Sequence, residues 1–252
     1  MSFQGKANAL YDAALSLAYP QECAVCGSSV ESRADGVACA MCWQKTRIFG
    51  EEDLICWKCG VPAEGSVPEE KRQDVYCRRC DAEPFRAARA CGAYEGALRA
   101  SVLALKREPY VARRLARLLF ETGRREPLTS ATRIVPVPLH PERLRERGFN
   151  QAATLGHALA RLTELPLDEF SLTRTIHTES HRAGMDARGR RESVEAAFQV
   201  SRPRLIEQER ILLVDDVFTT GATVSACARA LKDAGAQDVF VLTVARPVGS
   251  LL

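Results

Sequence analysis

The chain has 252 residues, of which 46% are hydrophobic and 27% charged, and 35 basic residues against 32 acidic ones leave a formal charge of +3. This length predicts one large domain or two ordinary ones, and the apolar content excludes disordered, collagen-like and low-complexity chains. Because no apolar run approaches the roughly 18 residues of a membrane helix and no export signal begins the chain, we expect a cytoplasmic protein without membrane insertion.

The first predicted element is a short helix over residues 5–19, where four small or apolar residues recur at helical spacing: Leu10, Ala14, Leu17 and Ala18. Eight of the ten cysteines follow as CxxC pairs: Cys23/Cys26, Cys39/Cys42, Cys56/Cys59 and Cys77/Cys80. Disulfides are disfavoured in a reducing cytoplasm, so four such pairs indicate thiolate metal ligands.

The cysteine pairs form an internal repeat. In each copy a CxxC followed by glycine precedes a second CxxC, with 12 intervening residues in the first copy and 17 in the second. Glycine turns the chain sharply after the second cysteine of a zinc knuckle at no steric cost. We therefore expect two structural zinc ions, whose binding supplies folding free energy that a weakly apolar segment lacks.

The repeat favours two sequential metal sites, one of Cys23, Cys26, Cys39 and Cys42 and the other of Cys56, Cys59, Cys77 and Cys80. Spacing alone leaves interleaved groupings open. An iron–sulfur cluster or a redox dithiol is the alternative to zinc. Ferredoxin-like spacing is absent, however, and a redox motif needs only one CxxC.

A domain boundary is predicted at Pro84, after a loop over residues 61–74 that contains proline, glycine and charges. It divides the chain into an N-terminal helix with a double zinc ribbon, residues 1–84, and a second domain, residues 85–252. Residues 86–147 hold 14 basic and 6 acidic residues. This excess predicts an anion-binding surface, unless the charges only solvate helix faces.

The second domain alternates between strands and helices. Strands are predicted over Ala90–Tyr94, Arg133–His140, Ala197–Val200, Arg210–Asp215 and Asp238–Ala245, and helices over 98–106, 110–121, 151–162 and 222–234. The strands over 210–215 and 238–245 form a βαβ unit with the helix over 222–234 between them. This unit predicts an α/β domain with a mostly parallel sheet. Cys91 and Cys227 lie in these patterns as expected core thiols.

The candidate chemistry concentrates in Val214–Thr223. An apolar strand ends in Asp215 and Asp216, at the edge where open parallel sheets bind ligands. A small-residue loop then opens a helix, so backbone N–H groups and the helix dipole converge on one point. Further donors and close backbone approach come from Thr219, Thr220, Gly221 and Thr223. The combination suits a sugar phosphate, whereas simple helix capping would explain a single residue.

The segment ILLVDDVFTTGAT resembles the phosphoribosyl pyrophosphate (PRPP) motif of type I phosphoribosyltransferases, and the whole chain resembles the ComF family. Further matches are Tyr94–Gly96 followed by Lys106, Pro136–His140, and the run Arg143–Gln151. The resemblance covers about residues 20–246. It implies a type I phosphoribosyltransferase-like α/β fold, preceded by a four-cysteine double zinc ribbon.

By this resemblance, Asp215 and Asp216 would be the catalytic pair and would bind the ribose hydroxyls directly or through Mg²⁺. The 5′-phosphate would lie in the loop of Thr219, Thr220, Gly221, Ala222 and Thr223. The diphosphate would face Lys106, His140, Arg143 and Arg147, although an arginine taken alone is more often solvated than bound to a ligand. Positioning and electrostatics would stabilise the cationic state in which pyrophosphate leaves the ribose.

One segment departs from the family pattern. Members usually carry TxxQxxL, then an arginine, an asparagine and AF, whereas residues 178–185 lack the glutamine and Ser193 stands at the asparagine. If that segment orders the diphosphate or the acceptor, the departure bears on turnover. His177 and His181 are four residues apart without a carboxylate partner, so we expect no third metal site.

Three functions stay open. The first is a PRPP-dependent phosphoribosyltransferase or PRPP hydrolase, with an acceptor that no residue set identifies. The second is a non-catalytic module that binds single-stranded nucleic acid, since the resemblance implies DNA uptake beside competence or recombination proteins. An aromatic content of 6% argues against this second function. The third is a PRPP sensor that contacts a partner through its ribbons.

Overall fold

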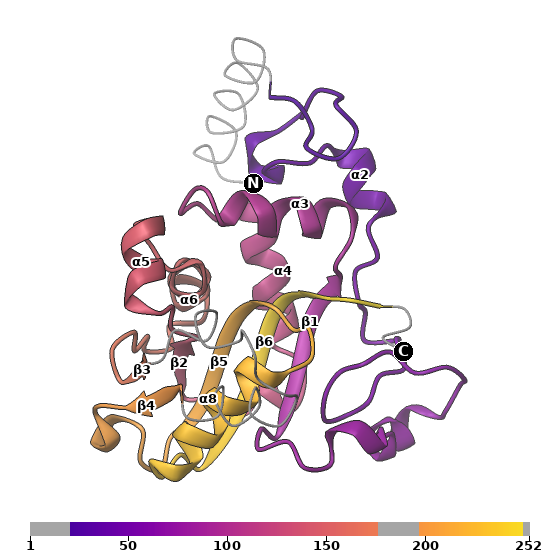
Figure 1. Ribbon diagram of the computed structural model, residues 1–252. Coiled ribbons are helices and arrows are strands. Elements are labelled where there is room, and N and C mark those ends of the chain that lie inside the picture. Colours follow the sequence, from indigo (N-terminus) through magenta and orange to yellow (C-terminus); the bar gives the residue numbers. More distant parts are fainter. Residues whose placement is uncertain (1–20, 176–196, 249–252) are drawn as a thin grey trace, which may run out of the picture.

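The computed structural model describes residues 21–175 and 197–248 (Figure 1). The helix predicted over residues 5–19 and most of the polar segment 172–195, with His177, His181 and Ser193, lie outside the described residues.

The centre of the molecule is a four-stranded, fully parallel sheet. Its spatial order is β1 (Ala87–Ala93), β6 (Asp238–Arg246), β5 (Arg210–Val217) and β2 (Arg133–Pro136). In the central pair, Leu213 lies opposite Val241 and Asp215 opposite Thr243. Because all four strands run the same way, their carboxyl ends share one edge of the sheet.

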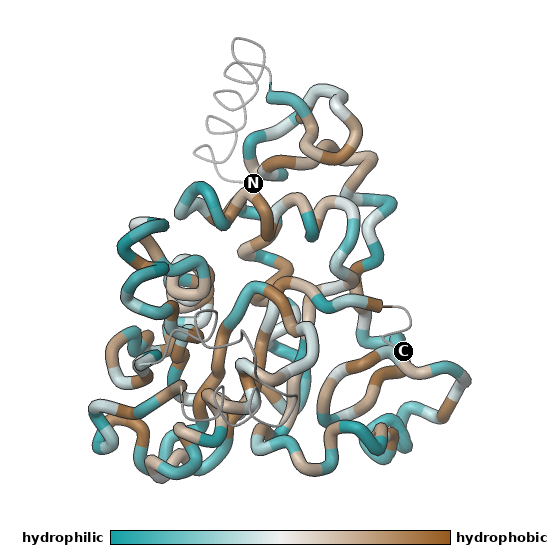
Figure 2. Tube along the Cα trace, in the orientation of Figure 1, coloured by the Kyte–Doolittle hydropathy of each residue, from teal (hydrophilic) through white to brown (hydrophobic). Residues whose placement is uncertain are grey.

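Helices cover both faces of this sheet. Leu212 and Val214 belong to the core formed with α3 (Gly96–Leu105), α4 (Arg113–Gly123) and α6 (Gln151–Thr163). Leu213, between them in sequence, packs on the opposite face with α8 (Ala222–Asp233). Burial on both faces explains why residues 211–214 of β5 and 239–242 of β6 are continuously apolar rather than alternating, a pattern that can be followed in the hydropathy colours of Figure 2. This α/β architecture confirms the predicted fold class.

Shorter elements complete the described chain. The antiparallel pair β3 (Leu172–Arg174) and β4 (Phe198–Val200) stands apart from the main sheet. The remaining helical segments are η1 (Arg33–Asp35), α2 (Ala40–Lys45), η2 (Glu69–Asp74), η3 (Arg78–Cys80), η4 (Leu128–Ser130), α5 (Pro141–Arg147) and η5 (Pro203–Leu205). No helix in residues 21–175 and 197–248 combines the length and apolar character needed to cross a membrane.

The two cysteine segments dock at separate places on the sheet domain, as Figure 1 shows. The first ribbon, residues 21–46, lies against α3, where the Thr46 hydroxyl accepts a hydrogen bond from the Ala97 amide at 2.8 Å. The second ribbon, residues 54–83, lies beside β1, whose Ala88 amide donates to the Lys58 carbonyl at 2.6 Å. These two contacts fix each ribbon to a different part of the same core.

The chain between the ribbons covers the exposed edge of the sheet. Ile48 forms an antiparallel bridge with Gly92, and the amides of Ala93 and Phe49 donate to the carbonyls of Arg47 and Cys91, each at 2.9 Å. A parallel edge strand with unpaired backbone groups invites aggregation, so this segment protects β1.

The segment after β2 differs most from the prediction. The strand expected over Arg133–His140 is too long, since β2 ends at Pro136, and Pro136 and Pro138 have no N–H to donate to a ladder. The short helix α5 (Pro141–Arg147) then follows, which hydrophobic periodicity could not reveal because none of its residues is buried. Cys91 and Cys227 are fully buried, as expected of core thiols.

Candidate functional site

The loop between β5 and α8, residues 218–221, holds three of the predicted ligand-binding residues. Thr219 and Thr220 are exposed, and Gly221 is the N-cap of α8 in a left-handed conformation, with φ of +83°. Within the described residues, the amides of Thr219, Thr220 and Gly221 donate no hydrogen bond. Amides at the positive end of a 12-residue helix are an anion-binding arrangement. We refer to residues 219–223 as the phosphate loop.

Two carboxylates lie at the strand end that leads into the phosphate loop. Asp216 is 8% exposed, and its Oδ2 is buried without a hydrogen-bond partner. Lys106, the C-cap of α3, places Nζ at 3.7 Å from this oxygen, an ion pair too long for a hydrogen bond. The Asp215 carboxylate accepts from the Asp216 amide at 2.8 Å. Desolvation and the charge of Asp216 raise the pKa of Asp215 to about 8.

These carboxylates suit a magnesium-bound sugar phosphate. Mg²⁺ prefers oxygen ligands and is usually held by one or two carboxylates together with substrate phosphates. The Asp216 Oδ2 is buried without a hydrogen-bond partner, so a cation or a ribose hydroxyl would satisfy it. The donor set therefore fits Mg²⁺ with a phosphorylated ribose.

The predicted diphosphate residues lie on a neighbouring element. α5 follows the carboxyl end of β2, the strand next to β5, and so begins at the ligand-binding edge of the sheet. His140 is its N-cap, Arg143 lies within it, and Arg147 donates to Oε1 of Gln151. Their contact with a diphosphate stays a prediction.

Asn150 has a structural task beside them. Its Oδ1 accepts from the Ala152 amide at 3.0 Å, which caps α6, and its Nδ2 donates to the Val137 carbonyl at 3.0 Å. Asn150 thus joins the start of α6 to the chain that leaves β2.

The eight paired cysteines gather in two clusters. They are the sequential groups Cys23, Cys26, Cys39, Cys42 and Cys56, Cys59, Cys77, Cys80, within each of which the sulfur atoms lie within 4.8 Å of one another. The interleaved groupings are therefore not found. In each cluster an amide donates to a first-cysteine sulfur at 3.3 Å, from Cys39 to Cys23 and from Cys77 to Cys56.

The sulfur spacing fits tetrahedral zinc. Zn–S bonds of about 2.3 Å give sulfur–sulfur edges of about 3.8 Å. The Cys26–Cys39 sulfurs are 3.7 Å apart, the Cys56–Cys80 sulfurs 3.6 Å and the Cys59–Cys77 sulfurs 3.5 Å. Four thiolates close the coordination shell, so both centres fit structural zinc.

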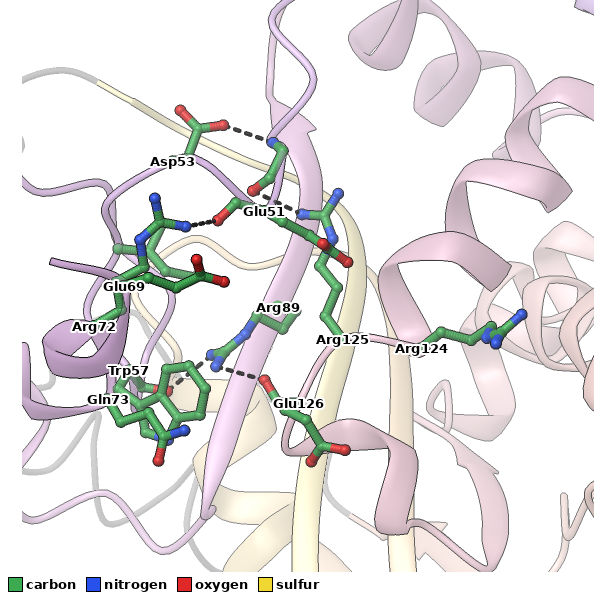
Figure 3. Close-up of a pocket in the computed structure, with 12 residues that line it drawn as sticks. Glu51, Asp53, Trp57, Glu69, Arg72, Gln73, Arg89, Arg124, Arg125 and Glu126 are labelled. Carbon is green, nitrogen blue, oxygen red and sulfur yellow. Dashed lines mark hydrogen bonds between the residues drawn. The ribbon is translucent and has the colours of Figure 1, made fainter.

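A cavity of about 330 Å³ lies between the second ribbon and the turn after α4, away from the phosphate loop (Figure 3). Arg89 of β1 crosses it and is 4% exposed. It stacks on the Trp57 ring at 4.9 Å and donates to the carbonyls of Trp57 at 2.8 Å and Glu126 at 3.0 Å. Its guanidinium is engaged with backbone carbonyls, so Arg89 holds the second ribbon in place.

A second buried arginine contacts both the second ribbon and Phe218, the residue that precedes the phosphate loop. Arg246, the last residue of β6, donates to the Cys59 carbonyl at 2.5 Å, and its guanidinium carbon lies 5.1 Å from the centroid of the Phe218 ring. Sequence analysis missed Arg89, Arg246 and Phe218. The available indication was a lone arginine within an apolar strand, since a buried charge needs specific partners.

Comparisons with known proteins agree with this organisation. The model of a double zinc ribbon domain matches residues 14–81, and that of a phosphoribosyl transferase domain matches residues 151–250. The DNA utilization protein YhgH of Escherichia coli is 32% identical over 216 residues, which are 82% of this chain and 89% of that protein. Competence protein F of Haemophilus influenzae is 34% identical over 142 residues, 54% of this chain and 62% of the relative.

Among solved structures, the chain is similar to glutamine PRPP amidotransferase from B. subtilis, with 18% identity and a TM-score of 0.37. The similarity covers 59% of this chain and 26% of that one, and it carries no argument about function.

Proposed function

The chain belongs to the ComF family, together with the competence and DNA utilization proteins it resembles, and from this premise we propose that it binds PRPP with Mg²⁺ at the carboxyl end of β5. The observation that carries the proposal is the buried Oδ2 of Asp216, which has no hydrogen-bond partner, at the end of the strand that leads to the unpaired amides of Thr219, Thr220 and Gly221. The two features together match the ribose hydroxyls and the 5′-phosphate of one ligand.

Each group has a role in this proposal. The phosphate loop and the α8 dipole hold the 5′-phosphate, while Asp215 and Asp216 accept the ribose hydroxyls and favour positive charge on the ring. Bound Mg²⁺ would neutralise charge on the diphosphate. Lys106 is proposed to supply a further positive charge there, and His140, Arg143 and Arg147 to approach from α5.

A transferase would use this arrangement to exchange the group on C1 of the ribose. The C1–oxygen bond to the diphosphate breaks, pyrophosphate leaves with the electron pair, and the acceptor forms a bond to C1 and loses a proton. With water as the acceptor the same step is hydrolysis. The chain's own residues orient the ribose and screen the cationic state; the acceptor enters from solution.

Calorimetry tests the binding site. PRPP should bind in the presence of Mg²⁺, and the double variant Asp215→Ala with Asp216→Ala should bind at least about tenfold more weakly, because both ribose ligands are lost. Asp233→Ala is the matched control, since Asp233 is an exposed carboxylate at the other end of α8. Unchanged affinity in the double variant would exclude the proposed site.

Turnover is tested separately. Incubation with PRPP, Mg²⁺ and a panel of nucleobases and amines should release pyrophosphate if the protein is a transferase. Release without any acceptor would favour PRPP hydrolysis. Binding without release would favour a PRPP sensor, in accord with the departure of residues 178–193 from the family pattern.

The names of the relatives favour a role in DNA utilization, and exposed arginines on two helices favour single-stranded nucleic acid as a second ligand. Exposed arginines recur on α4 and the turn after it, at Arg113, Arg117 and Arg124, and on α5 at Arg145. Fluorescence anisotropy with a labelled single-stranded oligonucleotide should then show affinity that falls steeply with salt. Binding insensitive to salt would remove this second candidate.

The proposal also includes the division of the chain into domains, the partner proteins and the cellular compartment. Residues 1–84 would carry the structural metals and residues 85–252 the phosphoribosyl site. Competence or recombination proteins would be the partners. The cytoplasm would be the compartment, because its reducing conditions keep cysteines available as metal ligands.

A further inference from the structure

We infer that Arg246 is a positioning residue that couples the second zinc ribbon to the phosphate loop, so that the metal-bound ribbon holds the loop in its ligand-binding geometry. The inference rests on the proposed binding of PRPP at that loop. It assigns the second ribbon a part in ligand binding.

The first step of the coupling is between the ribbon and Arg246. The Arg246 side chain is 7% exposed, and its Nη1 donates to the backbone carbonyl of Cys59. The sulfur of Cys59 belongs to the second cluster. The adjacent Gly60 approaches so closely that a Cβ there would lie 2.4 Å from the Ala88 carbonyl oxygen. The ribbon backbone and the sheet are thus in direct contact where the arginine bridges them.

The second step is between Arg246 and Phe218, the residue that precedes the phosphate loop. The guanidinium lies over the ring of Phe218, which is 7% exposed and meets Phe85 edge-on at 6.0 Å and 88°. The Phe218 ring also packs closely on Gly221, where a Cβ would lie 2.9 Å from Phe218 Cζ. Because Gly221 is the N-cap of α8, movement of the ring moves the first amides of the helix.

Charge balance explains why a metal-bound ribbon matters. Zn²⁺ with four thiolates carries a net charge of −2, and two buried arginines, Arg89 and Arg246, flank the second cluster. Without the charged cluster, Arg246 would be a buried cation with only an aromatic face and a carbonyl for partners.

A separate contact links the same two regions. The Ser225 hydroxyl, in the first turn of α8, donates to the Glu83 carboxylate at the end of the second ribbon. The ribbon therefore reaches α8 through a second contact that does not pass through Arg246. Because this contact remains when Arg246 is replaced, the expected effect of the substitution is on affinity rather than on folding.

Arg89 offers a matched control for Arg246. Both are strand arginines less than 10% exposed, both stack on an aromatic ring, and both donate to a carbonyl of the second ribbon. The difference is the partner ring, which is Trp57 of the ribbon for Arg89 and Phe218 beside the phosphate loop for Arg246. Lysine at either position keeps the charge but loses the planar stack.

The test measures Mg²⁺-PRPP affinity, zinc content and amide exchange in the full chain. Arg246→Lys should weaken PRPP binding about tenfold or more while two zinc ions per chain remain, whereas Arg89→Lys should stay within about threefold of wild type. Phe218→Leu, which removes the ring and leaves the arginine in place, should reproduce the Arg246→Lys loss. It also replaces that variant if Arg246→Lys does not fold.

Two outcomes would overturn the inference. If Arg246→Lys and Phe218→Leu bind PRPP like wild type, the coupling is absent. If Arg89→Lys loses as much affinity as Arg246→Lys, the effect is general destabilisation. If the wild-type protein does not bind PRPP, the proposed function fails, and hydrogen exchange alone tests the coupling. The coupling then requires that the amides of residues 219–224 exchange faster in Arg246→Lys than in Arg89→Lys.

Discussion

The Nζ of Lys106 lies 3.7 Å from Oδ2 of Asp216, so an ion pair joins the end of α3 to the ligand-binding edge of β5. The Asp216 side chain is 11% exposed and that of Lys106 38%. The carboxylate is thus largely removed from water, whereas the lysine keeps access to solvent and to any ligand at the strand end. We expect Lys106 to compensate the carboxylate before PRPP binds and to contribute positive charge afterwards.

Replacement of this lysine tests that role. Lys106→Met should weaken Mg²⁺-PRPP affinity about tenfold, because a positive charge at the diphosphate side is lost. Lys71→Met, which removes an exposed lysine from η2, is the control and should leave affinity unchanged. Calorimetry at constant ionic strength measures both. Tighter binding in Lys106→Met would mean that the ion pair competes with the ligand.

Gly221 is expected to tolerate no side chain. Its φ is +83° and a Cβ would contact Phe218 at 2.9 Å, so Gly221→Ala should lower the free energy of unfolding by about 2 kcal/mol and weaken PRPP binding. Gly148→Ala is a matched control, with φ of +82° and open space around its Cβ. Denaturant unfolding of both variants separates the contact with Phe218 from the backbone conformation. Equal losses would show that the contact adds nothing.

Each zinc centre should keep its ion when the other centre is disrupted. Cys77→Ser leaves three thiolates in the second cluster and should reduce the zinc content from two ions per chain to about one. Cys227→Ala, which removes a buried thiol outside both clusters, should keep two. Elemental analysis of the purified proteins measures this. Iron, or well under two zinc ions in the wild type, would contradict the structural-zinc assignment.

Glu209 should make stability depend on pH at the start of the sheet. A hydrogen bond from the Thr132 hydroxyl and the Arg133 guanidinium, whose Nη2 lies 3.1 Å from Oε1, hold the pKa of Glu209 below its usual value. A lowered carboxyl pKa stabilises the folded state above the unfolded-state pKa, and this contribution is lost as pH falls through the folded-state value. Glu209 therefore stabilises the protein at neutral pH and not in acid.

Glu209→Gln should accordingly lower the free energy of unfolding by about 1 kcal/mol at pH 7, a decrease in Tm of about 2–4 °C. The difference from wild type should shrink as pH falls below the unfolded-state pKa of about 4.3 and through the lower folded-state pKa, as the wild-type carboxylate takes up its proton. Glu70→Gln, at an exposed position of η2, should match wild type throughout. A gap that persists undiminished in acid would assign the effect to packing instead of charge.

Much of the candidate site could be predicted because its residues are contiguous. The strand, the two carboxylates, the glycine and the helix of Val214–Thr223 follow one another in the chain, so local propensities determine their arrangement. The metal clusters are similarly local, since each CxxC pair and its spacer closes within a short segment. α5 could not be predicted, because a seven-residue helix without a buried face has no hydrophobic period.

The sequence by itself determined the βαβ unit and the phosphate loop, because these depend on neighbours along the chain, and its internal repeat favoured two sequential sets of four cysteines over the interleaved groupings that the structure then excluded. Only the tertiary structure decided where the ribbons dock and which buried charges hold them. Arg246 and Cys59 are far apart in sequence, yet parallel pairing of β1 with β6 brings them together. Such contacts depend on strand order, and strand order is decided by the packing of the whole sheet.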